Sequence, residues 1–226
     1  MARLRRPALL LAFALAAAPC AAQDYVSPKV GLAIEFDSWR SEENDPAMRM
    51  ALPRLASEIV ALEGDTARVR FLEGGSQIAD NLTLRGIFTY RLKLASASTR
   101  LVGDFAPIRA LWPLAPGKSA ELRLQQQAQE NTAAGDGEWK ATGRTFVYRY
   151  RVEREEKVTV PAGQFEAWVI LREVTLLIAD GAQTRIETSR TWYAPALAWW
   201  VKFEHRAHDG GTVRLTVREA ARITGN

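Results

Sequence analysis

The chain has 226 residues, of which 47% are hydrophobic and 25% charged, and these ordinary values exclude a chain that is disordered throughout. The formal net charge is +4, but Arg3, Arg5 and Arg6 lie in the first 22 residues, which contain no acidic residue. Without these three, 27 of the 30 basic residues remain against 26 acidic residues, so we expect no nucleic-acid partner.

The first residues follow the pattern of a secretory signal. Arginines precede an apolar run of about 11 residues, at positions 8–18, and Pro19-Cys20-Ala21-Ala22 follows it. The run is too short to span a bilayer as a mature helix. We therefore expect residues 1–22 to be a signal peptide cleaved after Ala22. Residues 23–226 would then form a single β-rich domain, periplasmic or secreted, with no transmembrane segment.

Cys20 is the sole cysteine and lies within the expected signal. The mature chain would then have no disulfide, although its compartment would permit one. The alternative makes Cys20 the lipid-anchored first residue, but Pro19 directly before it is a poor match to a lipoprotein signal.

In the first half of the chain, apolar residues alternate with polar ones in several stretches. We expect a first strand over Lys29–Phe36, a hairpin over Ser57–Leu72 that turns at Gly64, and a strand-rich piece over Leu82–Leu94 with a bulge or bend at Gly86 near its start. Asp45-Pro46 could cap and begin a short helix over Ala47–Leu52, because aspartate suits the N-cap and proline the first helical position.

The second half carries the clearest alternation. A strand over Ser119–Gln126 precedes the loop-like stretch Gln127–Gly137. If two subdomains existed, their boundary would lie near residues 127–140. In Thr145–Val152, Phe146, Tyr148 and Tyr150 point one way and the intervening arginines the other.

Turn residues divide the rest of the chain into hairpins. Pro161 and Gly163 suit a type I turn, and Asp180-Gly181 suits a two-residue hairpin turn. For the last hairpin we expect a three-residue loop at 209–211 with a left-handed glycine, pairing Ala207 with Val213, His205 with Leu215 and Phe203 with Val217, because this register matches apolar with apolar positions.

These patterns predict a mainly β fold. We expect a strongly curved antiparallel sheet, or an open barrel or sandwich, built of consecutive hairpins with at most one or two short helices after the signal.

Two motifs carry a resemblance to a known kind of protein. The segment Val158-Thr159-Val160-Pro161-Ala162-Gly163-Gln164-Phe165, followed by Trp192-Tyr193-Ala194-Pro195, resembles uncharacterised bacterial periplasmic β-domains, a domain-of-unknown-function family. The resemblance covers roughly Leu111 to Glu219. Such domains are similar in architecture to outer-membrane lipoprotein carriers, whose curved sheet wraps an apolar cavity. The resemblance implies a fold and brings no catalytic residues with it.

Glu204, His205, His208 and Asp209 form the one local concentration of ligand or acid-base groups, and they include both histidines. A separation of three on a strand sends His205 and His208 to opposite faces, so we expect neither a metal site nor another cofactor. Asp37, Glu42, Glu43 and Asp45 are expected in a solvated loop. No mature cysteine and no serine in a nucleophile elbow supports covalent catalysis, so we expect no catalytic residue.

Tryptophans offer a further lead, because Trp168 lies opposite Phe165, Ala167 and Val169, and adjacent Trp199 and Trp200 must face opposite ways in a strand. They either fill the core on both faces or line a pocket.

The leading hypothesis is a non-enzymatic protein that binds an apolar or lipid-like ligand, or a cell-envelope partner. It predicts a cavity lined by six residues: Phe146, Tyr148, Tyr150, Val169, Phe203 and Val217. Two alternatives stay open: a cell-envelope polymer hydrolase, in which Glu204 or another carboxylate meets a second one or His205 in a cleft, and a structural component of an envelope assembly.

Overall fold

The alternating segments of the sequence form the strands of one continuous antiparallel sheet. The computed structural model describes residues 24–225 except 43–44, 133–134, 178–182 and 210–211. Within that part of the chain there are thirteen strands and one short helix. The strands are β1 (Ala33–Glu42), β2 (Asp45–Glu63), β3 (Thr66–Glu73), β4 (Ser76–Leu84), β5 (Phe88–Lys93), β6 (Ala97–Val102), β7 (Ser119–Thr132), β8 (Gly135–Asp136), β9 (Lys140–Val160), β10 (Gly163–Leu177), β11 (Gln183–Ala194), β12 (Trp199–Asp209) and β13 (Thr212–Thr224), and the helix is α1 (Ala106–Arg109).

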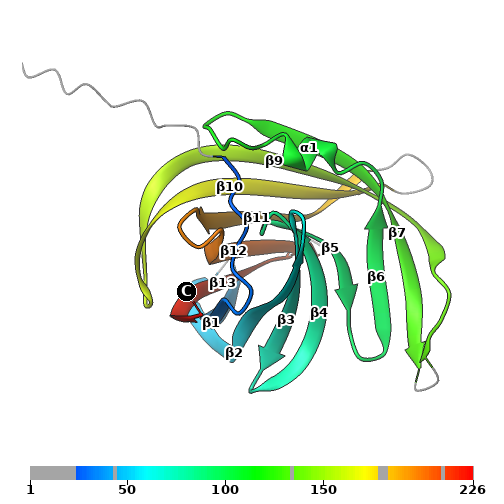
Figure 1. Ribbon diagram of the computed structural model, residues 1–226, viewed down its shortest axis with the longest axis horizontal. Helices are drawn as coiled ribbons and strands as arrows, with labels where there is room; N and C mark the ends of the chain where they lie inside the picture. Colours follow the sequence, from blue (N-terminus) through cyan, green and yellow to red (C-terminus); the bar gives the residue numbers. More distant parts are fainter. Residues whose placement is uncertain (1–23, 43–44, 133–134, 178–182, 210–211, 226) are drawn as a thin grey trace, which may run out of the picture.

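The sheet closes on itself. Each strand pairs with the next along the chain, except that β8 pairs only with β7, and β7 pairs onward with β9. The last strand, β13, pairs with β1, and β6 pairs with β7, so twelve strands form a closed barrel. Figure 1 shows β9 and β10 arching over the upper side of the barrel and β3 to β6 at its lower right. The expected curved antiparallel sheet of consecutive hairpins is confirmed, in its closed form.

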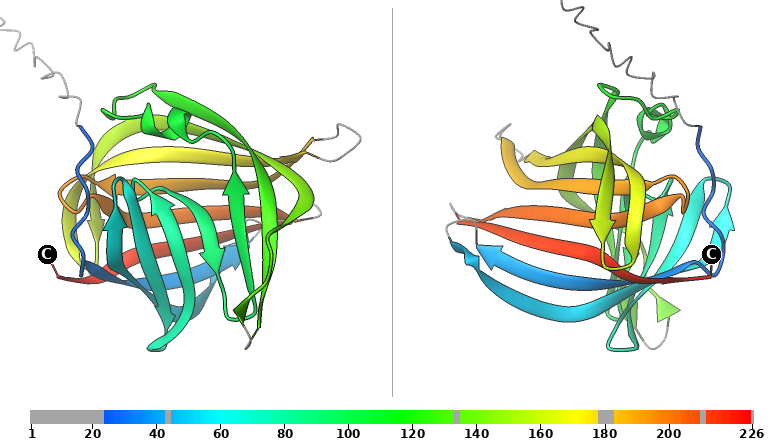
Figure 2. Two further views of the ribbon diagram at one scale, coloured as in Figure 1. Left: turned by 45° about the vertical axis from the view of Figure 1, so that its right-hand side comes forward. Right: turned by 90° about the vertical axis from the view of Figure 1, so that its left-hand side faces the viewer.

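A twelve-stranded barrel is too wide for inward side chains to fill completely, because barrel diameter grows with strand number. One end is filled by two buried clusters. In the first, which we call the end cluster, residues of the β9–β10 hairpin such as Val160 and Ala167 pack against Leu32, Ile34 and Trp199. The distal part of that hairpin bends across the barrel end (Figure 2), where the Ala162 N–H donates to the Ala220 carbonyl at 2.9 Å.

The second cluster joins α1 and the segment after it to the barrel wall. Ile108, Leu111 and Leu114 are at most 1% exposed and pack with Phe88 and Leu122. Nearby, Asp65 accepts hydrogen bonds from Arg85 at 3.1 Å and Arg109 at 2.8 Å, which ties the β2–β3 turn to α1. Residues 103–118 therefore pack as part of the barrel end.

Local expectations are wrong in two kinds of place. The first is where a strand replaces an expected loop or helix: Asp37 and Glu42 lie in β1, Asp45 lies in β2, and residues 127–132 lie in β7, not in loops. Residues 47–52 lie in β2 and not in a helix, because Trp39 and Arg40 of β1 pair with Ala51 and Met50. The backbone hydrogen bonds of a long strand outweigh a local cap signal for a helix of under two turns. The helix that does form, α1, lies elsewhere.

The second correction concerns the last hairpin. Phe203 pairs with Arg218, His205 with Thr216 and His208 with Val213, so the register differs by one residue from the expected one. Because successive side chains of a strand point to opposite faces, this slip puts Arg218, and not Val217, on the same face of the sheet as Phe203. The expected left-handed glycine at 210 or 211 lies outside the described residues. So does the expected Asp180-Gly181 turn, although Leu177 and Gln183 on either side of it pair.

Candidate functional site: a cavity in the barrel lumen

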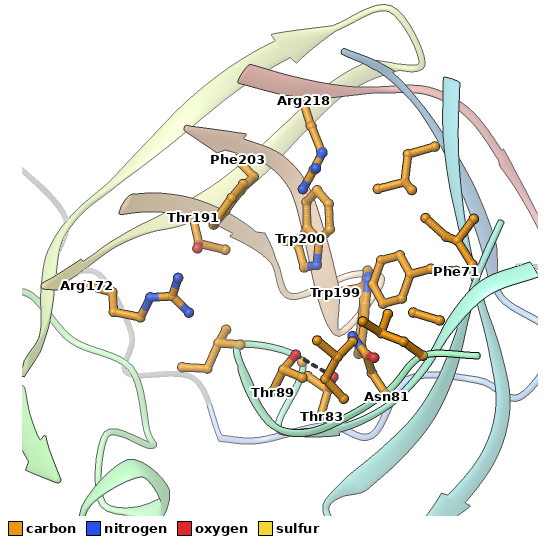
Figure 3. Close-up of a pocket in the computed structure, with 17 residues that line it drawn as sticks. Phe71, Asn81, Thr83, Thr89, Arg172, Thr191, Trp199, Trp200, Phe203 and Arg218 are labelled. Atoms are coloured by element: carbon orange, nitrogen blue, oxygen red, sulfur yellow. Dashed lines mark hydrogen bonds between the residues drawn. The ribbon is translucent and has the colours of Figure 1, made fainter. Parts of the chain in front are cut away.

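A cavity of about 460 Å³ lies inside the barrel, between the β2–β5 wall and the β10–β13 wall. Figure 3 shows its lining side chains pointing toward one another from these two walls. We call it the lumen cavity, and its lining residues are Leu55, Phe71, Ile78, Ala79, Asn81, Thr83, Gly86, Ile87, Thr89, Leu92, Leu94, Arg172, Thr191, Trp199, Trp200, Phe203 and Arg218.

The alternating side-chain directions of β4 turn part of this lining toward the inside of the barrel. Ala79, Asn81 and Thr83 are buried inside, whereas Asp80 between them forms an ion pair with Arg68 on the outer face. Phe71 pairs across the strands with Ala79.

Aromatic side chains supply much of the remaining surface. The ring of Trp200 stacks on that of Phe36, with centroids 4.1 Å apart and an interplanar angle of 15°. The Phe203 ring follows at 5.8 Å from Trp200, and Trp199, 1% exposed, fills the end of the cavity nearest the end cluster. Large rigid rings of this kind make an apolar surface that loses little entropy when a ligand binds.

Access to the cavity lies beside Ile78 and Leu94, each 43% exposed although both line it. Ile78 lies near the start of β4 and Leu94 directly follows β5, at the barrel end opposite α1. An exposed apolar pair at the rim of an apolar cavity is suited to guide an apolar group inward.

The first of two arginines in the lining, Arg172, has a counter-ion. Its guanidinium contacts the Glu187 carboxylate closely, and His205 lies 3.3 Å from the same carboxylate through Nε2. Burial acts to raise the pKa of Glu187, but Arg172 and His205 outweigh it and lower that pKa to about 2. Burial raises the pKa of Tyr150, which lies beside Arg172, to about 12. Arg172 and Glu187 therefore form a charged pair whose charges offset each other.

The second arginine, Arg218, differs from Arg172 in having no ion pair within the described chain. Burial, together with the like charge of Arg40, lowers the pKa of Arg218, and Glu73 opposes that shift. Its Nε atom is buried and has no hydrogen-bond partner among the described residues. In Figure 3 its side chain reaches toward the cavity alongside Trp200. The lining therefore contains two arginines and no acidic residue, with one arginine uncompensated.

Other buried polar atoms of the lining also lack partners in the described part of the chain. These are Arg172 Nε, Asn81 Oδ1 and Trp199 Nε1, whereas the hydroxyls of Thr83 and Thr89 satisfy each other at 3.0 Å. Unsatisfied buried polar atoms are uncommon in native structures, and they mark this wall as able to accept or donate hydrogen bonds.

The structure places the six predicted lining residues in different surroundings. Phe203 lines the lumen cavity. Phe146 and Tyr148 line a smaller neighbouring cavity of about 200 Å³, and Tyr150 lies beside Arg172. Val169 belongs to the end cluster, and Val217, 4% exposed, lies on the opposite side of β13 from Arg218, because of the register described above. Whether any of the six contacts a ligand stays a prediction.

The histidines and Glu204 do not converge. His205 meets Glu187, whereas His208 approaches the Thr188 hydroxyl at 3.5 Å from the other face of β12. Glu204 forms ion pairs with Lys202 at 3.6 Å and Arg206 at 3.9 Å. Among the described residues, no group of three or more His, Cys, Asp or Glu side chains is placed to hold a metal ion.

Sequence reasoning missed Arg172, Glu187, Asn81 and Arg218. A usable signal exists for Arg218, because it shares the inward period of β13 with Thr216 and Ala220, but using that signal requires the correct register. Arg172 and Glu187 could be identified as neighbours only with the knowledge that β10 pairs with β11 in the observed register.

The membrane question has one direct finding. In the part of the chain described by the structure, no helix has the length and apolar character needed to cross a bilayer.

No protein-family model matches the sequence, and no curated protein matches it. Among solved structures, the hypothetical lipoprotein YmcC from Escherichia coli is similar, with 10% identity, a TM-score of 0.45, and 82% of this chain covering 83% of that one. A Bacteroides fragilis protein with a YmcC-like fold, provisionally described as exported, has 11% identity and a TM-score of 0.45 over 89% of this chain and 99% of that one. A provisionally described lipoprotein from Parabacteroides distasonis has 8% identity and a TM-score of 0.44 over 91% and 100%.

These neighbours are uncharacterised β-proteins described as lipoproteins or exported proteins, the kind of protein that the sequence resembles. At such identities and TM-scores, they carry no argument about what this chain binds.

Proposed function

We propose that this chain is an exported, non-enzymatic β-barrel protein that binds an apolar or lipid-like ligand in the lumen cavity. The observation that carries the proposal is the cavity itself. Its volume of about 460 Å³ falls within the roughly 300–1,000 Å³ typical of small-molecule sites. Its lining is mostly apolar and aromatic, with a few polar groups, as such sites usually are.

The build of the barrel supports this proposal. The end cluster and the α1 segment fill one end, while the apolar residues Ile78 and Leu94 mark access near the other. The remaining large apolar side chains exposed in the described chain lie on separate segments: Val26, Val30, Met50 and Val102. Because the exposed apolar side chains are scattered, the surface favours a small ligand over the two alternatives that require a protein partner, which are an envelope partner and a structural role in an envelope assembly.

The hydrolase alternative is less well supported by the geometry. The arrangement nearest to a catalytic site is the contact between Glu187 and His205. Ser189 on β11 is paired with His205 on β12. Ser189 is 1% exposed, and its Oγ makes no hydrogen bond to a described residue, so His205 does not activate it as a nucleophile. Arg172 holds Glu187 charged, which suits an ion pair better than a general acid.

Export is part of the proposal and rests on the arginine-rich and apolar pattern before Gln23. In this view, residues 1–22 are removed near Ala22, and residues 23–226 act as one β-rich domain in the periplasm or outside the cell.

The test is to fill the cavity from its wall. Ala79 is 7% exposed and lines the cavity, so Ala79→Val and Ala79→Phe add side-chain volume in two steps. We expect the affinity for N-phenyl-1-naphthylamine, a neutral apolar fluorophore, to fall stepwise, by at least about tenfold for Ala79→Phe. Ala61→Phe, at an exposed position on β2, is the matched control and should bind like the unaltered chain.

Titration of the fluorophore, followed by its emission and by tryptophan quenching, gives the affinities, and far-UV circular dichroism verifies that each variant is folded. Failure of the unaltered chain to bind the fluorophore would overturn the proposal. Equal binding by the folded Ala79→Phe variant would place the binding site elsewhere and overturn it too.

A further inference from the structure

We propose that Arg218 is the head-group site of the lumen cavity, and that the ligand is a single-chain amphiphile with an oxyanion head, a carboxylate or a phosphate monoester. This inference rests on the proposed function and names the class of ligand. The apolar tail would lie against the aromatic wall, and the oxyanion would pair with the Arg218 guanidinium.

Arg218 is directed into the cavity by the pairing of its strand. It faces Phe203 on β12 and Ser38 on β1, and directly paired residues of antiparallel strands share a face. Phe203 lines the same cavity, and Ser38 is 7% exposed. The guanidinium thus lies among the inward residues of the barrel, where water cannot fully solvate it.

The charge state of Arg218 follows from its surroundings. Burial and Arg40 lower its pKa, yet an arginine stays protonated in proteins. Arg218 is half-buried with its Nε fully buried, and a partly desolvated charge without an ion pair is destabilising, which makes it a candidate for a functional group. Glu73, the opposing charge that acts on it, forms no ion pair with it in the described chain. An anionic ligand would supply the missing counter-charge.

Arg172 provides an internal comparison within the same cavity. Its Nε, like that of Arg218, has no hydrogen-bond partner among the described residues, but its charge is paired with Glu187, whose carboxylate is itself held charged by Arg172 and His205. An anion approaching Arg172 would therefore meet the negative charge of Glu187. Of the two lining arginines, only Arg218 is placed to receive an oxyanion.

The tail region lies next to this charge. Leu55, Phe71 and Trp199 line the cavity, and in the close-up Trp200 lies between Arg218 and Trp199 (Figure 3). A planar guanidinium binds a carboxylate or phosphate through two parallel hydrogen bonds, which fixes the head while the tail stays against the rings. The cavity thus offers a charged point beside an apolar wall, which matches an amphiphile better than a neutral lipid.

The experiment compares four probes by titration calorimetry below their micelle concentrations: dodecanoate, dodecyl phosphate, dodecanol and inorganic phosphate. The unaltered chain should bind dodecanoate or dodecyl phosphate more tightly than dodecanol. Arg218→Gln should weaken binding of the charged probes by about ten- to a hundredfold and leave dodecanol binding unchanged. Arg218→Lys should bind the charged probes with an affinity between those of the unaltered chain and Arg218→Gln. Arg123→Gln, at an exposed position on β7, is the matched control and should bind all four probes like the unaltered chain.

Dodecanol binding by Arg218→Gln also shows that this variant is folded. If Arg218→Gln does not fold, the affinity of Arg218→Lys for the charged probes tests the site instead. Equal affinity of unaltered and Arg218→Gln chains for dodecanoate and dodecyl phosphate would overturn this inference, while retained dodecanol binding would leave the proposed function standing. Inorganic phosphate binding as tightly as dodecyl phosphate would make the site one for a free anion and overturn the amphiphile. Absence of binding by all chain-bearing probes would overturn the proposed function itself.

Discussion

The ion pair between Arg172 and Glu187 predicts a specific loss of acid stability. The pKa of Glu187 is lowered to about 2 from its ordinary value of 4.5, even though burial acts in the opposite direction. At about 1.4 kcal/mol per pH unit of pKa difference, the charged carboxylate stabilises the fold by about 3 kcal/mol. A carboxyl with a lowered folded-state pKa contributes this stability fully above about pH 4.5 and loses it as the pH falls toward 2.

Glu187→Gln removes the titrating group and leaves Arg172 without its counter-ion. At pH 7 we expect the free energy of unfolding to fall by about 3 kcal/mol, which agrees with the cost of breaking a buried pair. With a urea dependence of about 2 kcal/mol per molar, the midpoint would fall by roughly 1.5 M. Near pH 2.5 the two chains should differ by less than about 1 kcal/mol, because the pH is then close to the folded-state pKa of Glu187 and most of the stabilisation by its charge has been lost.

The assay is urea denaturation from pH 7 to 2.5, followed by tryptophan fluorescence. Glu121→Gln is the matched control, because Glu121 pairs with Arg149 at 2.7 Å on the surface, where both side chains are about half exposed. Such a pair contributes less than about 1 kcal/mol. If the stability curves of Glu187→Gln and the unaltered chain stayed parallel across the whole pH range, the reasoning about this pair would be refuted.

Two further predictions concern the filled end of the barrel. Val160→Ala removes two methyl groups from the end cluster and should lower the free energy of unfolding, measured by urea denaturation, by about 1.5–3 kcal/mol. Thr159→Ala, at an exposed position, should change it by less than about 0.5 kcal/mol. Equal effects of the two substitutions would contradict the packing. Arg85→Met removes the 3.1 Å ion pair with Asp65 and the cation–π contact with Trp112, whose ring centroid lies 5.2 Å from the Arg85 guanidinium carbon. We expect the free energy of unfolding to fall by about 1–2 kcal/mol. An unchanged thermal unfolding midpoint would contradict this prediction.

Much of the local structure could be predicted because period-two alternation and turn chemistry are local properties. The hairpin at Gly64 forms with Glu63 paired to Thr66, and the hairpin at Pro161 forms with Val160 paired to Gly163. The common face of Phe146 and Tyr148 is also confirmed, since they pair with Leu124 and Leu122, which are both buried inside.

Errors arose where a strand is held from both sides. Local pairing of apolar residues favoured Phe203 opposite Val217, but β13 must also pair with β1, and there Arg218 meets Ser38 and Ala220 meets Phe36. Two neighbouring strands together fix a register that one hairpin leaves undetermined. The same competition turned the expected helix at 47–52 into strand.

The sequence by itself determined a β fold of consecutive hairpins and a pattern typical of an exported chain, because side-chain alternation, turn residues and a signal pattern are all read over short stretches. The tertiary structure alone decided the closure of β13 on β1, whose paired residues are 172 to 191 positions apart, and with it the cavity and the inward position of Arg218. Closure depends on non-local pairing, whose register no short stretch of sequence encodes.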